Sequence, residues 1–386
     1  MNQPAEREMW WLPRTQLQQL IDAMHRRGYR VVGPVVRSGA IIYDTLDHVD
    51  QLPTGWTDTQ SPATYQIQNT HHQRQFEFNS SPDSWKKYLF PAWQELSGAK
   101  LTNDGWQFSS KIDPPEKLAL FGVRGCDLAA IKIQDRVFLN DDFVDPVYSR
   151  RRESALIVAV QCSTAAATCF CTSMNTGPHC EAGFDIALTE TDEGFCVESQ
   201  SDEGQTIIAE LELSLADGDQ RQAAANELEK AKQAIRKQMD TRNIHDDLLD
   251  NLEHPHWDEV AARCLSCTNC TMVCPTCFCS TVNEVSDLDQ HDVTRVRQWD
   301  SCFNLDFSYT AGGTVRNDIR SRYRQWLTHK LATWQDQFDT IGCTGCGRCI
   351  TWCPVGIDLT EEVDAIRKPS TQNAPTKQTT AVENKS

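Results

Sequence analysis

The sequence predicts an α+β fold, and three observations along its 386 residues support this prediction. Strand-like and helix-like patterns alternate in the first half of the chain, a stretch rich in Ala, Gln, Glu and Lys follows, and two cysteine-rich motifs stand in the last third. We therefore expect a mixed α/β domain over residues 1–200, an acidic helical connector over 201–257, a helical cysteine-rich domain over 258–366 and a disordered tail over 367–386.

The N-terminal domain is predicted from its periodicity. "RTQLQQLIDAMHRRG" has apolar residues at helical spacing and ends at a glycine, and "YRVVGPVVRSGAIIYDTL" is typical of two strands around a turn. In "KLALFGVRGCDLAAI" a strand leads through a tight turn into a helix at Cys126, and the apolar strand of "ESALIVAVQC" ends at Cys162. Because sites in open α/β sheets lie at the carboxyl ends of strands, these two cysteines indicate a site.

Composition narrows the possible functions. The net charge of -17 and the pI near 5.0 argue against a nucleic-acid partner, which requires a basic face. The N-terminal residues lack the pattern of a secretory signal, and the sequence has no apolar stretch of membrane-spanning length, so we expect a cytoplasmic protein. In a reducing compartment, 17 clustered cysteines indicate metal or redox chemistry rather than disulfides.

The C-terminal cysteines form a repeated motif. "RCLSCTNCTMVCP" and "GCTGCGRCITWCP" both have the spacing C-x2-C-x2-C-x3-C-P, in which three thiolates wrap one 4Fe-4S cluster and the fourth ligates the other. The motif predicts two 4Fe-4S clusters, one bound by Cys264, Cys267, Cys270 and Cys353 and the other by Cys343, Cys346, Cys349 and Cys274. A pair of zinc sites is the alternative, but it does not explain the third cysteine at the same step.

The insert between the two motifs is longer than in a compact bacterial ferredoxin and favours a helical ferredoxin-like domain. Its apolar residues at helical spacing are Ile319, Tyr323, Trp326, Leu327 and Leu331. Its basic residues are Arg316, Arg320, Arg322, Arg324, His329 and Lys330. These basic residues form either a solvated helix face or a patch that offsets thiolate charge or binds an acidic partner.

A third cluster is predicted in the N-terminal domain. In the extended segment "TCFC", residues two apart point to one side, so Cys169 and Cys171 can reach the same metal. Cys126 and Cys162 would complete a four-thiolate site, with Cys180 as a rival fourth ligand, whereas Cys196 is interpreted as a buried small apolar residue.

The same letters "TCFC" recur after the first C-terminal motif and provide Cys277 and Cys279. Together with Cys302 they exceed the eight ligands that the two motifs need. Either they are buried and inert, or they are reactive thiols that attack sulfur species such as polysulfide.

Several motifs resemble those of the β subunits of cytosolic nickel-iron sulfhydrogenases and of the related A subunits of anaerobic sulfite reductases. They are "VRGCDLAAI", "QDRVF", "TCFCTSMNTGP", "GFDIALTE", "RCLSCTNCTMVCPTCFCS", "WDSCF", "AGG" and "GCGRCI". The resemblance covers residues 10–366 and implies an iron-sulfur subunit that relays electrons between a catalytic subunit and a flavin subunit binding a nicotinamide cofactor. Such families usually have proline where this chain has Gly125, which loosens the turn before Cys126.

The functional prediction is an electron-transfer subunit of a cytosolic oxidoreductase complex with hydrogenase or sulfite- or sulfur-reducing subunits and a flavin/NAD(P)-binding subunit. The sequence has neither a nucleotide-binding fingerprint nor the cysteine pairs that bind nickel, so we predict no catalytic residue of its own. The alternatives are an anaerobic sulfite reductase A-type subunit and a cluster-based redox sensor, although a sensor usually needs a basic output surface.

Overall fold

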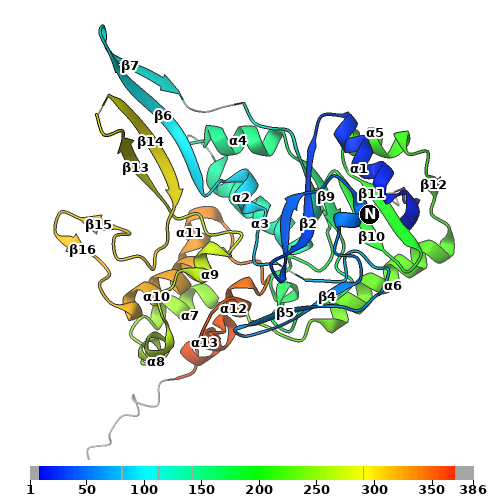
Figure 1. Ribbon diagram of the computed structural model, residues 1–386. Coiled ribbons are helices and arrows are strands. Elements are labelled where there is room, and N and C mark those ends of the chain that lie inside the picture. The colour runs from blue at the N-terminus through cyan, green and yellow to red at the C-terminus, as the bar shows by residue number, and fades with distance from the viewer. Residues whose placement is uncertain (1–7, 80, 111–113, 141–142, 290, 370–386) are drawn as a thin grey trace, which may run out of the picture.

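The computed structural model describes residues 8–79, 81–110, 114–140, 143–289 and 291–369 (Figure 1). A large sheet lies on the right of Figure 1, a smaller sheet projects at the upper left, and short C-terminal helices gather below it. This mixture of α and β elements confirms the predicted class. Of the tail predicted over residues 367–386, the part from residue 370 on lies outside the described residues. No helix in the described part of the chain has the length and apolar character of a membrane span.

The large sheet has eight strands in the order β12-β1-β11-β10-β9-β8-β2-β3. The strands are β1 (Trp10–Pro13), β2 (Arg30–Arg37), β3 (Ala40–Thr45), β8 (Leu118–Val123), β9 (Leu156–Val160), β10 (Ile186–Glu190), β11 (Gly194–Ser199) and β12 (Ser214–Leu215). The four central strands are parallel and almost completely buried, whereas the edges are antiparallel. As predicted, β8 and β9 end beside the N-terminal cysteines.

Helices cover both faces of this sheet. They are α1 (Leu17–Arg26), α2 (Lys86–Leu89), α3 (Gly125–Phe138), α4 (Pro146–Glu153), α5 (Asp202–Glu210) and α6 (Gly218–Ala234), with the 3-10 turns η1 (Arg14–Gln16), η2 (Val49–Gln51) and η3 (Cys171–Met174). The core on the α1 and α5 side contains Ile207 and Ile208 of α5. Cys196 of β11 contacts α6, where its thiol donates to Gln220 O. Cys196 is fully buried, as predicted for this cysteine.

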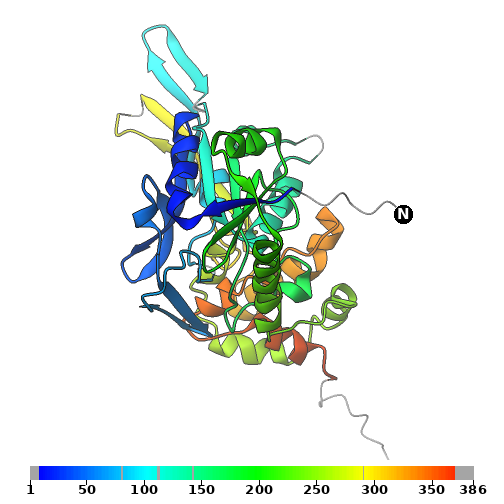
Figure 2. The same cartoon turned by 90° about the vertical axis from the view of Figure 1, so that its right-hand side faces the viewer.

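The smaller sheet combines two hairpins that are far apart in sequence, in the order β13-β14-β6-β7. Its strands are β6 (Trp93–Thr102), β7 (Gly105–Ser110), β13 (Ser280–Ser286) and β14 (Asp292–Trp299), and it extends away from the body in both ribbon views (Figures 1 and 2). We had expected a helical insert between the cysteine motifs, but β13 and β14 form a hairpin within it. A hairpin alone is marginally stable, and pairing β14 with β6 gives each hairpin a partner.

The C-terminal helices surround the cysteine motifs. They are α7 (Ile244–Asp250), α8 (His256–Arg263), α9 (Asn269–Met272), α10 (Ile319–Thr328), the π-helix η4 (His329–Thr333), α11 (Trp334–Phe338), α12 (Arg348–Thr351) and α13 (Leu359–Ile366). Their core contains Trp257, Tyr323, Trp326, Leu331 and Val363, which confirms the helical pattern predicted from residue 319.

Residues 201–257 contain the helices α5, α6 and α7 and the short strand β12, and they are not a purely solvated connector. Ile207 belongs to the core of the large sheet, and Ile244 and Leu248 belong to the core of the C-terminal helices. The apolar residues are too sparse for a strong periodic signal, which is why composition alone suggested a solvated segment. Two short hairpins complete the fold: β4 (Trp56–Ser61) with β5 (Thr64–Asn69), and β15 (Tyr309–Thr310) with β16 (Gly313–Thr314).

Candidate metal centres

The two C-terminal cysteine loops have the same backbone geometry. Two and four residues after the first cysteine, both loops adopt positive φ, at Ser266 and Thr268 in one loop and at Gly345 and Gly347 in the other. The backbone N–H of Ser266 donates to Cys264 Sγ at 3.4 Å, and that of Gly345 donates to Cys343 Sγ at 3.5 Å. Loops that curl in this way point backbone donors at sulfur, and hydrogen bonds to sulfur accompany iron-sulfur ligation. The two loops therefore fit the clusters that their spacing predicts.

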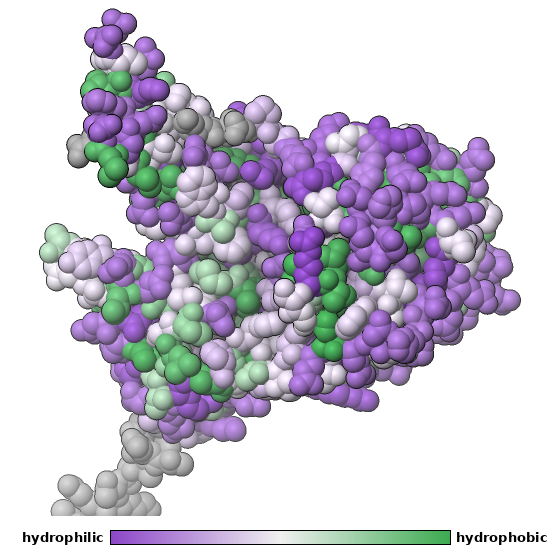
Figure 3. Space-filling view, viewed as in Figure 1, coloured by the Kyte–Doolittle hydropathy of each residue, from purple (hydrophilic) through white to green (hydrophobic). Residues whose placement is uncertain are grey.

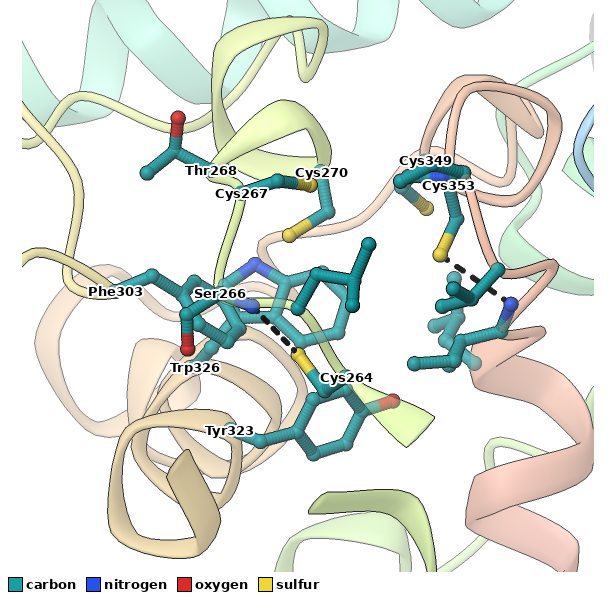
Figure 4. A pocket seen from close by; sticks show the side chains of 15 residues that line it. Cys264, Ser266, Cys267, Thr268, Cys270, Phe303, Tyr323, Trp326, Cys349 and Cys353 are labelled. Carbon is teal, nitrogen blue, oxygen red and sulfur yellow. Dashed lines mark hydrogen bonds between the residues drawn. The ribbon is translucent and has the colours of Figure 1, made fainter. Parts of the chain in front are cut away.

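The first set of cysteines, which we call centre I, consists of Cys264, Cys267, Cys270 and Cys353. All four line one pocket, together with Phe303, Tyr323 and Trp326 (Figure 4). Figure 4 shows the sulfurs of Cys264, Cys270 and Cys353 facing a common space, and Ile357 N donates to Cys353 Sγ at 3.3 Å. The structure thus brings together the predicted ligands of the first cluster, with the exposed Cys267 on the solvent side.

The second set, centre II, consists of Cys274, Cys343, Cys346 and Cys349. The thiols of Cys343 and Cys349 both lie close enough to those of Cys274 and Cys346 to interact with them electrostatically. This is expected for four sulfurs around one space. Burial raises the pKa of the Cys343 thiol to about 12. Because ligand cysteines must be deprotonated, such a site is favourable as a thiolate site only when a positive metal charge is bound.

A buried lysine points into centre II. The Nζ atom of Lys330 donates to Cys274 Sγ at 3.3 Å, to Thr276 Oγ1 at 3.2 Å and to Gly342 O at 3.0 Å. The side chain comes from η4, and Lys330 is only 3% exposed. Within the predicted basic patch, Lys330 therefore offsets sulfur charge, whereas Arg320 and Arg324 form surface ion pairs with Glu253. Helical periodicity in the sequence could not distinguish these roles, because Lys330 lies in a π-helix and its side chain does not point in the direction that a regular α-helix would give it.

The third set, centre III, consists of Cys126, Cys162, Cys169 and Cys171, and it lies at the carboxyl ends of β8 and β9. All four line a second pocket. Burial raises the pKa of the Cys169 thiol to about 12. The rival ligand Cys180 is buried behind this pocket, where its thiol lies 3.7 Å from Val160 O.

The buried Arg124 is a residue of centre III that sequence reasoning missed. It lines the same pocket, interacts with the Cys162 sulfur and donates to Gln161 O at 3.0 Å and Phe76 O at 2.8 Å. In the sequence, the only signal for Arg124 was its position at the turn between β8 and Cys126. Arg124 gives centre III a fixed positive charge, as Lys330 does for centre II.

Centres II and III share a wall. A Cβ atom at Gly345 would lie 2.7 Å from the backbone of Phe170, and one at Gly347 would lie 2.5 Å from Thr168 O. Both glycines therefore permit the Cys343–Cys349 loop to pack directly on the first TCFC segment, and Phe170 N donates to Gly345 O at 2.8 Å. Cys346 of centre II consequently lines the pocket of centre III.

A buried ion pair joins the helices that carry these two centres. Arg348 of α12 pairs with Asp127 of α3 at 2.9 Å, and both side chains are almost completely inaccessible to solvent. Asp127 follows Cys126 and Arg348 precedes Cys349, so the pair fixes the two helix N-termini against each other. On the other side of centre II, Cys349 lines the pocket of centre I.

The surplus cysteines, Cys277, Cys279 and Cys302, line neither the pocket of centre I nor that of centre III. Cys277 contacts Cys274, and Cys279 contacts Cys302. Considering only the described residues, no group of three or more His, Cys, Asp or Glu side chains has the spacing of a site for a single metal ion.

Comparisons with known proteins support 4Fe-4S clusters in the C-terminal part of the chain. Residues 263–357 match a family described as a 4Fe-4S dicluster domain. The chain is 34% identical over 347 residues to sulfhydrogenase 2 subunit beta of Pyrococcus furiosus, which covers 88% of this chain and 92% of that protein. No solved structure matches the chain. With this identity over nearly the whole of both proteins, the chain belongs to the family of sulfhydrogenase β subunits.

Proposed function

We propose that the chain is the electron-transfer subunit of a cytoplasmic oxidoreductase complex and that centres I, II and III each hold a 4Fe-4S cluster. A 4Fe-4S cluster, when bound, supplies a centre that accepts and releases one electron. The observation that carries the proposal is the contact between centres: Cys346 lines centre III and Cys349 lines centre I, although both belong to the loop of centre II. The relay order is therefore III, II, I.

The polypeptide supports such a relay by holding sulfur ligands and charges at fixed positions. Burial of thiolates is costly, and Lys330 beside Cys274 and Arg124 beside Cys162 offset that cost. Buried positive charges and hydrogen bonds to sulfur also set the reduction potential of a bound cluster. The residues lining the three centres thus suit the binding and tuning of clusters.

Centre I is the end at which an external partner would exchange electrons. Cys267 is exposed, and the neighbouring apolar residues Leu265 and Val355 are 61% and 38% exposed. Figure 3 shows apolar side chains gathered at the lower left, over the C-terminal helices. We propose that this surface binds a catalytic subunit or a flavin/nicotinamide subunit. The sulfhydrogenase relative favours a hydrogenase or sulfur-reducing complex over the sulfite reductase and redox-sensor alternatives.

Iron analysis of anaerobically purified protein tests the proposal. Three cubane clusters require about twelve irons per chain. Replacing Cys169 and Cys171 by serine should remove about four irons, whereas replacing the matched pair Cys277 and Cys279 should remove none. A wild-type content of about eight irons would reject centre III as a cluster site and leave the other two. Iron loss from the second pair alone would reverse the assignment.

Co-purification tests the partner proposal. Affinity purification of the tagged chain from its native cells should yield a nickel-iron subunit and a flavin-containing subunit in defined ratios. Recovery of a sirohaem protein instead would select the sulfite reductase alternative. Failure of reduced protein to pass electrons to any co-purified subunit would reject the relay.

A further inference from the structure

The second TCFC segment places a cysteine at the base of the projecting sheet. Cys279 immediately precedes β13, and Cys302 follows the end of its antiparallel partner β14. The ladder pairs Ser280 with Trp299, and Asp300 N continues it by donating to Cys279 O at 2.8 Å. Closing this hairpin therefore brings two cysteines that are 23 positions apart in the sequence to the same end of the ladder.

The two side chains contact each other directly. The thiol and the backbone N–H of Cys302 both donate to the sulfur of Cys279. Cys277, in contrast, makes its thiol contact with Cys274 of centre II. Cys279 and Cys302 are both free thiols, and neither lines the pocket of centre I or that of centre III.

The turn that carries Cys302 is held rigidly. The hydroxyl groups of Ser301 and Thr271 lie 2.8 Å apart in the interior, and Phe303 N donates to Ser301 Oγ at 3.1 Å. Thr271 belongs to α9, so the turn is anchored to the helix of the first cysteine motif. Cys302 is 9% exposed and Cys279 is partly exposed, so Cys279 is the more exposed of the two cysteines.

The surroundings favour a reactive thiolate at Cys279, the more exposed of the two cysteines. Hydrogen bonds from Cys302 and the positive charge of Lys330 lower the pKa of Cys279 to about 7. A thiolate with a pKa near the ambient pH attacks disulfide sulfur most effectively, and a neighbouring thiol can then resolve the mixed disulfide.

We propose that Cys279 and Cys302 form a redox-active dithiol that closes to a disulfide by exchange with a small-molecule disulfide. The Cys279 thiolate attacks one sulfur of oxidised glutathione, forming a mixed disulfide and releasing one glutathione thiolate. The Cys302 thiol, on losing its proton, then attacks Cys279 Sγ and releases the second glutathione. The two cysteines together lose two electrons and two protons, and one glutathione disulfide becomes two glutathione thiols. The chain thereby contains a two-electron site beside its one-electron centres.

The test uses full-length, cluster-loaded protein equilibrated anaerobically in glutathione buffers from reducing to oxidising, then alkylated and digested with trypsin. Cys302 is the only cysteine in the peptide 298–316, whereas Cys279 lies in the peptide 264–295. We expect a disulfide between these peptides that increases with the oxidised fraction of the buffer. Fragmentation of the linked peptides should assign it to Cys279.

Matched variants establish which thiols react. The cross-link should fall to background in Cys302→Ser and in Cys279→Ser, and Cys302→Ser should instead accumulate glutathione on Cys279. Cys277→Ser, two residues away, should retain the cross-link. Wild-type protein in which both thiols remain alkylatable at the oxidising limit would overturn the proposal. A second result would also overturn it: Cys279 and Cys302 are neither alkylatable nor disulfide-bonded, and Cys302→Ser loses about four irons. The two cysteines would then be cluster ligands.

Discussion

Replacing Lys330 by methionine should lower the reduction potential of the cluster at centre II. Reduction adds negative charge, which the Lys330 ammonium group stabilises, so removing that group disfavours the reduced state. Nζ lies 3.3 Å from Cys274 Sγ and the side chain is buried, so solvent screens the interaction weakly. For about 6 Å between Nζ and the transferred electron and an effective dielectric constant of about 20, Coulomb's law gives roughly 3 kcal/mol. For one electron this equals roughly 120 mV.

The assay is a redox titration of purified protein followed by electron paramagnetic resonance, which resolves the reduced clusters individually. Lys230→Met is the matched control, because Lys230 is exposed on α6 and its removal should leave all potentials unchanged. Iron content must equal that of the wild type, so that a shift reports tuning and not cluster loss. A Lys330→Met protein with full iron content and a centre II potential within about 20 mV of the wild type would refute the electrostatic reasoning.

Three further predictions follow from the packing around the centres. Gly345→Ala should lower the free energy of unfolding by more than Gly356→Ala does. Both residues have positive φ, which costs a non-glycine residue about 1 kcal/mol. Only at Gly345 would the new Cβ also lie within 3 Å of backbone atoms, those of Phe170. Arg348→Met should destabilise the protein by about 3–5 kcal/mol in chemical denaturation, because it leaves Asp127 buried without its partner, and the double variant with Asp127→Leu should recover most of that loss. Removing iron with a chelator should lower the thermal transition of the C-terminal helices in calorimetry, since cysteines of centres I and II pack against their core; an unchanged transition would show that the helices hold together without metal.

The sequence was informative about the centres because much of their geometry is local. In the C-terminal loops, three ligands of each set lie within seven residues, so spacing alone indicated which cysteines would meet. The strand-end cysteines Cys126 and Cys162 were predictable because the parallel order of β8 and β9 places their carboxyl ends side by side. Gly125, which we expected to loosen the turn, does not remove Cys126 from centre III.

The features that the sequence did not predict depend on contacts between distant segments. The pairing of β6 with β14 joins residues nearly 200 positions apart, and neither hairpin carries a signal for the other. Likewise, Lys330 is one of six basic residues of similar spacing, and only the π-helix and the approach of Cys274 distinguish it. The two TCFC segments are identical in sequence, yet the first packs on Gly345 and Gly347 and the second leads into β13.

The exposure of the cysteines differs between centre I and the other two centres. In centres II and III the cysteines are buried or partly buried, and burial alone would lower the potential of a bound cluster because a reduced cluster carries more negative charge. Lys330 and Arg124 oppose that effect, so clusters bound at centres II and III would not be forced to potentials far below that of a cluster at centre I, where Cys267 is exposed. With clusters bound as proposed, the relay through III, II and I would then contain no large energetic step. Removing either cation should therefore slow transfer through the relay even where every cluster remains bound.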